Sequence, residues 1–437
     1  MNVVRWFRWG LVGLLVGMIV GFSPDIHAES LTLDECINIA LQRNISVASS
    51  RYSLDLARQD VWSAWGYWLP KFRVSAGYSY SEQGGKTEYQ TISRISRLYS
   101  KSISVEQNLF RWGQNWFYIK NKLHLRRSSE HKLTRSELEV IDNVKYYYFS
   151  ALKFEGLLAV AQQAVEAAAE NLRLVQARFE LGSANQSELL KAKVQFLTNR
   201  ASLEETKKSS ALSLAQLNNV MNRPPTVPLE LEAPYDTLAV TVDFDGAIQY
   251  AREHHPSILA SEAELQAARY GKLMAKADYL PTVSWSASRS YSVDRVRMWD
   301  SFDDQFGNWR FGLGFSWPIP FFDGFSRKIS HSRATAGYRL ANLNLESTIN
   351  SVGLEVQTAL LDINNTRAKL ALYEESLRSA EEDLEIAQER YKLGAATILD
   401  LLDAEKNLAE ARNNFVSAKF DFNRNVAALD KAMGKRQ

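Results

Sequence analysis

The chain of 437 residues contains a single cysteine, Cys36, so an intramolecular disulfide is excluded. Cys36 follows Leu33-Asp34-Glu35, and acidic residues there do not fit a lipoprotein cleavage box, so we expect no lipid anchor. Its residue type favours a buried structural role on a helix. Proline is also scarce, at 10 residues, which permits unusually long helices.

The sequence also lacks a strong charge imbalance and long apolar runs. A formal net charge of +2 gives no electrostatic basis for binding nucleic acid. The apolar run at residues 11–22 follows Arg5 and Arg8 and precedes Ile26-His27-Ala28, and no other stretch approaches the length of a membrane-spanning helix. This layout predicts a secretory signal peptide over residues 1–28, with an uncleaved anchor helix as the alternative.

Motifs of catalysis are missing too. His254 and His255 are adjacent rather than spaced as metal ligands, and Pro256 follows them at an expected helix break. There is no Gly-rich phosphate loop, nucleophile elbow or Cys/His cluster. With 46% hydrophobic and 23% charged residues the chain is expected to fold, but we expect no enzyme activity, no cofactor and no metal site.

The sequence does contain an internal repeat. Pro281 in Tyr-Leu-Pro follows Pro70 in Trp-Leu-Pro by 211 residues, and Gly394 follows Gly182 by 212 residues in two similar Arg-Phe/Tyr-x-Leu-Gly segments. Between these pairs, Leu109-Phe110-Arg111-Trp112-Gly113 matches Pro320-Phe321-Phe322-Asp323-Gly324. A repeat this long is not a solenoid unit and implies two similar halves.

A proline-rich segment separates the halves, because Pro224, Pro225, Pro228 and Pro234 stop the preceding helix. We therefore predict five parts of the chain. They are the signal peptide (1–28), a first repeat (29–222), a crossover (223–239), a second repeat (240–434) and a short C-terminal end (435–437).

Each repeat should open with a helical segment that ends before its Leu-Pro, followed by segments that alternate with period two. One face of these segments is apolar and aromatic and the other is small and polar, which predicts four strands per chain, at about 71–81, 99–110, 282–293 and 308–318. The length of nine to eleven residues suits a membrane barrel, although a soluble sheet with one buried face gives the same pattern. The polar connections 81–98 and 294–307 are expected to be extracellular loops, and Arg289 on the apolar face should lie near an interface.

Four strands cannot close a membrane barrel, and an open edge in lipid is not tolerated. Other copies of the chain must therefore complete the wall. Counting strands alone permits a dimer of eight strands or a trimer of twelve.

Two very long helices are expected after the strands, because residues 112–181 and 325–393 contain no proline. Seventy helical residues extend roughly 105 Å. Each helix should turn at Leu-Gly and return as a second helix, over 186–221 and 398–433, in antiparallel coiled-coil hairpins. Gly182 and Gly394 stand where a helix C-cap favours glycine.

The repeat, the paired Leu-Pro breaks, the Phe-Asp-Gly-like strand exits and the paired Leu-Gly turns together resemble the TolC-like outer membrane efflux protein (outer membrane factor) family, over essentially the whole mature chain. The resemblance implies an α+β membrane protein with two structural repeats. A long antiparallel coiled-coil α-barrel joins a trimeric 12-stranded outer-membrane β-barrel to which each chain gives four strands. It also implies a mixed α/β belt near the middle of the helices, for which the crossover and the C-terminal end are candidates.

The implied function is a passive outer-membrane channel of a tripartite efflux pump or a type I secretion system. Its implied partners are outer-membrane lipid, a periplasmic membrane-fusion adaptor and an inner-membrane pump of the RND, ABC or MFS type. The alternative is an envelope-spanning coiled-coil scaffold that conducts nothing. The sequence does not identify the cargo.

The resemblance assigns roles to residues of the two turns. Asp400 and Asp403 lie one helical turn apart, and in family members aspartates at this spacing line the periplasmic entrance, where a ring of like charges attracts cations and can raise carboxyl pKa values. The first repeat has Glu188 and Lys191 instead, and Ala396 stands where some relatives carry a basic latch. Tyr391 is the candidate tether of the gate, and the candidate adaptor contacts at the hairpin tips are Leu181, Gly182, Ser183, Leu393, Gly394 and Ala395.

Overall fold

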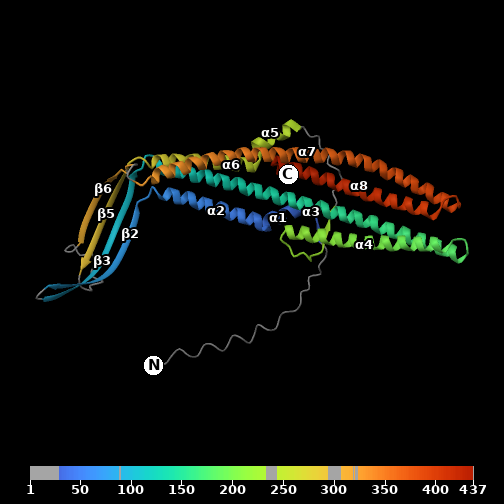
Figure 1. Cartoon of the computed structure of the whole chain (residues 1–437), viewed down its shortest axis with the longest axis horizontal. Helices are drawn as coiled ribbons and strands as arrows, with labels where there is room; N and C mark the ends of the chain where they lie inside the picture. Colours follow the sequence, from blue (N-terminus) through green and yellow to red (C-terminus); the bar gives the residue numbers. More distant parts are fainter. Residues whose placement is uncertain are drawn as a thin grey trace, which may run out of the picture.

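The computed structural model describes residues 29–87, 90–232, 244–293, 307–317, 319 and 323–436. The predicted signal peptide, most of the predicted loop 294–307 and the end of the predicted crossover lie outside these residues. The molecule is elongated, with a sheet at one end and two helical hairpin tips at the other (Figure 1). Within the described residues, no helix combines the length and apolarity needed to cross a bilayer.

Each half begins with two helices where the sequence predicts one helical segment. In the first half α1 (Leu33–Arg43) is followed by α2 (Ile45–Gly66), and in the second α5 (Phe244–His254) is followed by α6 (Pro256–Ala277). The break falls at Asn44 and at His255, whose extended backbone cannot continue a helix. Each of these side chains instead caps the helix that follows it, which satisfies an amide at the new N-terminus.

The large sheet has the order β2-β3-β5-β6, with all neighbours antiparallel. Its strands are β2 (Lys71–Thr87), β3 (Gln90–Phe110), β5 (Thr282–Val293) and β6 (Gly307–Ser316). The prediction for 282–293 is confirmed, and the fourth strand is ten residues long and ends at Ser316 instead of residue 318.

The predicted loop at 81–98 is wrong. β2 and β3 continue as a paired hairpin as far as Thr87 and Gln90, well beyond the last pairing of β3 with β5 at Tyr99 and Val293. The sequence of this hairpin does not alternate apolar with polar residues. Periodicity therefore carries no signal there, while backbone pairing still forms a ladder.

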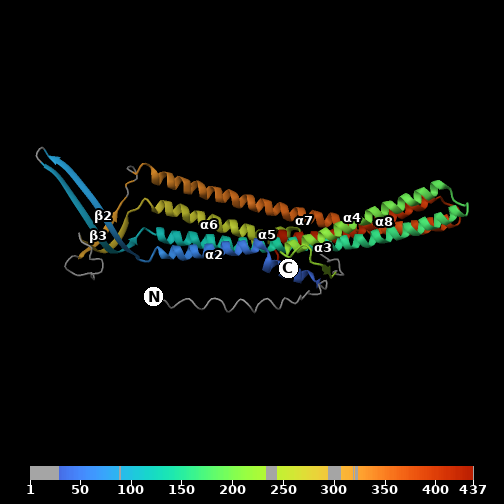
Figure 2. The ribbon, with the colours of Figure 1, turned by 90° about the horizontal axis from the view of Figure 1, so that it is seen from below.

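Four helices make the hairpins: α3 (Gln114–Glu180), α4 (Gln186–Val220), α7 (Ser326–Lys392) and α8 (Ile398–Met433). α3 and α7 contain 67 residues each, which corresponds to about 100 Å. Both run the full length of the helical body (Figure 2). Towards the sheet the order across the layer is α2-α3-α6-α7, and towards the tips it is α4-α3-α8-α7.

A two-stranded parallel sheet lies near the middle of the molecule. It pairs β1 (Glu29–Leu31) with β4 (Leu229–Leu231) from the crossover. The second strand of this small sheet therefore comes from residues 29–31, and the described residues of the expected C-terminal segment form no strand. Tyr148 of α3 donates a 2.5 Å hydrogen bond to the carbonyl of Glu232 beside this sheet, and Cys36 is fully buried in the same core, as expected.

Candidate functional site: the two hairpin tips

The two hairpin tips, residues 181–185 and 393–397, lie at the end of the molecule farthest from the sheet (Figures 1 and 2). A small apolar core holds them together. It contains Val175 of α3, Ala192 of α4, Tyr391 of α7 and Leu401 of α8, all buried. All four long helices contribute to this core, so the tips form one rigid end.

Both turns have the same backbone structure. Gly182 and Gly394 adopt left-handed φ values of 78° and 72°, which glycine tolerates at low cost. The amide of Gly182 donates to the Phe179 carbonyl at 2.9 Å, and the amide of Ser183 donates to the Arg178 carbonyl at 2.8 Å. The second turn repeats both hydrogen bonds, so each helix ends in a Schellman motif.

The leucine side chains that precede these glycines are exposed to solvent. Leu181 is 84% exposed and Leu393 is 81% exposed. Burying a leucine side chain is worth about 2 kcal/mol, so an exposed leucine at the end of each of two helices favours contact with another protein. Ser183 and the two glycines are also exposed and Ala395 is exposed beside them, so the structure brings all six predicted contact residues to this end.

Asp400 is exposed and serves as a helix cap. Its carboxylate accepts hydrogen bonds from the amide of Thr397 at 2.7 Å and from the Thr397 hydroxyl at 2.8 Å, while the Thr397 hydroxyl accepts from the amide of Asp400 at 3.3 Å. The hydrogen bond from the Thr397 amide, followed by that from its hydroxyl, lowers the pKa of Asp400. Within one chain the shift is therefore opposite to the rise expected from a ring of like charges, because hydrogen bonds to the ionised form dominate.

Asp403 lies one turn further along α8 and is also exposed. It lines an open groove of about 630 Å³ between the first turns of α4 and α8. Lys191 and Lys406 line the same groove, so Asp403 faces a mixed environment within one chain. Leu190, Val194, Leu399 and Leu402 make much of its wall apolar.

Tyr391 is only 6% exposed and lies in the core between the hairpins. The guanidinium of Arg178 stacks over its ring, 4.7 Å from the centroid. A basic group therefore does reach the second turn, but it comes from α3 instead of from position 396. The sequence places Arg178 in the first Arg-Phe-x-Leu-Gly segment, yet only the fold brings it to Tyr391.

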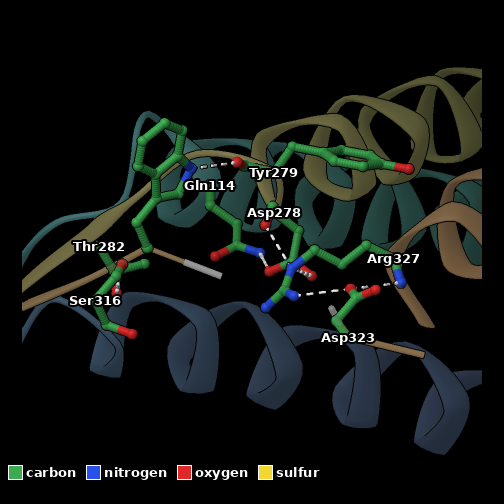
Figure 3. A network of polar contacts seen from close by, with 8 residues as sticks. Gln114, Asp278, Tyr279, Thr282, Ser316, Asp323 and Arg327 are labelled. Atoms are coloured by element: carbon green, nitrogen blue, oxygen red, sulfur yellow. Dashed lines mark hydrogen bonds and ion pairs between the residues drawn. The ribbon is translucent and has the colours of Figure 1, made fainter. Parts of the chain in front are cut away.

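A second polar cluster, at the opposite end, joins the helices to the sheet (Figure 3). Arg327 of α7 donates to the Asp323 carboxylate at 2.9 Å and to the carbonyl of Asp278 at 2.9 Å. Gln114 of α3 donates to the Asp278 carboxylate at 3.3 Å. Asp323 belongs to the Phe-Asp-Gly motif, and through Arg327 this motif ties the start of α7 to the end of α6.

Comparison with known proteins identifies the family to which the chain belongs. The sequence model described as "Outer membrane efflux protein" matches residues 36–223 and again residues 247–435. The chain belongs to the outer membrane efflux protein family. The resemblance predicted from the sequence is thereby confirmed.

Two curated relatives of this family illustrate its range. The chain is 23% identical over 429 residues to the outer membrane protein TolC of Vibrio cholerae serotype O1, covering 97% of this chain and 95% of TolC. It is also 23% identical over 328 residues to the alkaline protease secretion protein AprF of Pseudomonas aeruginosa, covering 74% of this chain and 67% of AprF. The protein is an outer-membrane channel of the efflux and type I secretion class, as predicted.

Among solved structures, the fold is similar to that of the outer membrane protein VceC from Vibrio cholerae. The TM-score is 0.81 at 20% identity, covering 92% of this chain and 96% of VceC. The predicted combination of long helical hairpins and antiparallel β-strands is therefore confirmed as the fold of this outer membrane efflux protein.

Proposed function

We propose that this outer-membrane channel is the exit duct of a tripartite export machine. It receives substrate from a periplasmic membrane-fusion adaptor and an inner-membrane pump of the RND, ABC or MFS type, and releases it outside the cell. The duct forms as a homotrimer with a barrel of twelve strands.

The large sheet carries this proposal. Phe72, Val74 and Leu313 lie on one face and are 74%, 76% and 74% exposed, a degree of apolar exposure that lipid accommodates and water disfavours. β2 and β6 each have one neighbour in the described sheet, so each has a free edge. Since lipid cannot satisfy the backbone groups of an edge, further copies must pair with both edges. Three copies give the twelve strands that the family resemblance implies.

The lateral edges of the helical body support the same assembly. α7 forms one edge along its whole length, and α2 and α4 form the other. Both edges carry exposed aliphatic side chains, which suit burial between neighbouring copies. On α7 these are Leu340, Leu343, Leu354, Leu361 and Leu372, and on α4 they are Leu190, Val194 and Leu197.

We also propose that the chain is built from two repeats, 29–222 and 240–434. The element order supports this, because two helices, two strands and a long hairpin follow one another twice. The two halves of the sheet and of the tunnel wall would then come from one ancestral unit, and the boundary lies in the crossover that holds β4.

At the periplasmic end, Asp400 and Asp403 form the entrance constriction in this proposal, Tyr391 tethers the second hairpin and the leucine–glycine tips contact the adaptor. The exposure of both carboxylates and of Leu181 and Leu393 supports these roles. In a trimer the carboxylates would stack as two rings of three, which attract cations.

Conductance separates a duct from the alternative, a scaffold that conducts nothing. The mature protein, purified in detergent, is added to a planar lipid bilayer at about 1 M KCl, where surface charge is screened. Discrete single-channel steps are expected, along with trimers on cross-linking. Trimers that insert into the bilayer without conducting would support the scaffold instead.

A further inference from the structure

The second face of the large sheet is lined almost entirely by small polar residues. Strand pairing places Ser75 opposite Ser102, and Ser102 opposite Ser290, so hydroxyls follow one another across the sheet. The same face holds Gly77, Ser79, Ser100, Ser104, Ser284, Ser286, Ser288, Ser292, Gly312, Gly314 and Ser316. Because the opposite face is apolar, this face is the one that lines the water path of the proposed duct.

Two arginines interrupt this surface in the same cross-strand row. Arg73 of β2 pairs with Ser104, Ser104 pairs with Ser288, and Ser288 pairs with Arg310 of β6. Residues directly opposite each other point to the same side of a sheet, so both arginine side chains lie on the hydroxyl-lined face, and their backbones are about 14 Å apart across three strand spacings. Both side chains are exposed, and no ion pair of either is present among the described residues.

The charges on this face do not cancel. In the neighbouring row Lys71 lies opposite Glu106 in the strand register, so their formal charges cancel and the two arginines remain as the net charge of the described side chains on this face. On the apolar face, which also carries Arg97 and Lys101, the guanidinium of Arg289 stacks 5.1 Å from the centre of the Trp309 ring. Arg73 and Arg310 have no such aromatic partner among the described contacts and point into the water path.

We propose that Arg73 and Arg310 form an anion-selective ring in the barrel, and that the cargo class of this duct is organic anions bearing carboxylate or phosphate groups. The inference rests on the proposed trimeric duct, in which three copies bring six guanidiniums to one lumen. Guanidinium binds carboxylate and phosphate through paired hydrogen bonds, and serine hydroxyls on the same row add further donors. Rings of arginine select anions in pores by the same physics.

Charge along the duct then changes sign from one end to the other. The proposed entrance is acidic and the barrel is basic, so an anionic cargo meets its attractive site at the exit side. The acidic entrance lets such a cargo pass only when the pump drives it, and the basic barrel holds back cations that diffuse in from outside. The barrel would thus favour anions over cations, while the pump sets the outward direction.

Reversal potentials in a KCl gradient test the ring. They are measured in the Asp400→Ala/Asp403→Ala background, so that the entrance carboxylates do not contribute. This parent channel should prefer chloride over potassium at about 0.01 M salt, where the screening length is about 30 Å, and should lose the preference near 1 M. Replacing both arginines, Arg73→Ser/Arg310→Ser, should lower the chloride-to-potassium permeability ratio on the order of tenfold.

Three variants serve as controls. Arg73→Lys/Arg310→Lys keeps the charge and should keep the preference, Glu106→Gln should increase it, and Arg289→Ser on the apolar face should leave it unchanged. Inorganic pyrophosphate added to the outer side should shorten open times of the parent and not of the serine variant. A conducting parent whose selectivity ignores the arginines would overturn the ring alone, whereas a protein that never conducts would overturn the proposed duct and the ring with it.

Discussion

The two hairpin tips have the same backbone but different charges. Both end in a Schellman glycine after an exposed leucine, and both restart with a capped helix, at Asn185 and at Thr397. At the third and sixth positions of the new helix the first tip has Glu188 and Lys191, whereas the second has Asp400 and Asp403. The backbone therefore sets a shape that both tips share, and the side chains decide which tip can form an acidic constriction.

The joints between the short helices differ in a similar way. Asn44 caps α2 through its amide oxygen, which accepts from the amide of Ser46 at 2.8 Å. His255 caps α6 through Nδ1, which accepts from the amide of Ser257 at 3.2 Å. Asparagine does not titrate and histidine does, so the same cap is independent of pH in one half and dependent on pH in the other.

The shared backbone of the tips predicts the largest effect. Gly394→Val and Gly182→Val should each abolish efflux while trimers remain in the membrane, because valine at a φ above 70° costs about 1–2 kcal/mol and displaces the leucine before it. Substrate accumulation in cells and immunoblots of unheated membranes measure the two properties. Gly271→Ala on the inner helix α6, where an added Cβ meets no atom closer than 3.9 Å, should change neither. Loss of the trimer in the tip variants would indicate a folding defect instead.

The charge difference between the tips predicts the next effect. Asp400→Ala/Asp403→Ala should alter single-channel conductance and weaken block by divalent cations on the order of tenfold, because two carboxylate rings concentrate cations at the constriction. Glu188→Ala/Lys191→Ala at the first tip removes one charge of each sign and should have little effect. Unchanged conductance and block in the aspartate variant, measured in planar bilayers, would reject the assignment of the constriction.

The difference between the joints predicts a pH effect. Burial, with Arg135 and Lys431 nearby, lowers the pKa of His255 to about 4, and Glu139 and Glu355 line the same pocket. The contribution of His255 to the free energy of unfolding is therefore fully present above pH 6.5. It falls by about 3 kcal/mol per chain between pH 6.5 and 4, because in that range the imidazole takes up a proton only in the unfolded chain.

His255→Asn gives the second joint the same capping residue as the first, and it should flatten the dependence of stability on pH. Thermal unfolding of the detergent-solubilised protein from pH 7 to 4 measures the difference between wild type and variant, which removes contributions from other groups. Asn44→Gln in the first joint serves as the matched control and should shift all temperatures equally. A parallel pH profile for wild type and His255→Asn would contradict the proposed role of the imidazole.

The caps of the tips predict the smallest effect. Thr397→Ala removes the hydroxyl of a capping box, and Asn185→Ala removes a cap that accepts from the amide of Glu188 at 2.9 Å, so each should destabilise its turn by about 1 kcal/mol. Hydrogen exchange at the first amides of α4 and α8 should become several-fold faster in the altered tip only. Thr358→Ala in the middle of α7 should leave both tips unchanged.

Much of the fold follows from local sequence. The long helices and their turns were predictable because proline is absent for about 70 residues and Leu-Gly then ends each run. β1 was not predictable, since three residues are too few for periodicity and its partner Leu229–Leu231 is far away in sequence.

The site was predictable only in part. The exposed positions of Asp400 and Asp403 follow from the family register, and the Thr-x-x-Asp spacing could have indicated the cap that lowers the Asp400 pKa. Arg178 stacks on Tyr391, which lies 213 positions further along the chain. Only the packing of the two hairpins brings these residues together.

The free edges of β2 and β6 have a genetic consequence. In the proposed ring every edge must find a partner on another chain, so a single copy with a defective edge leaves a gap in the wall. A chain with Leu313→Pro, which removes an amide from β6, should therefore have a dominant-negative effect on the wild-type copies made in the same cell. Cells that express both would export far less than half as well, because only rings built wholly from intact chains would close.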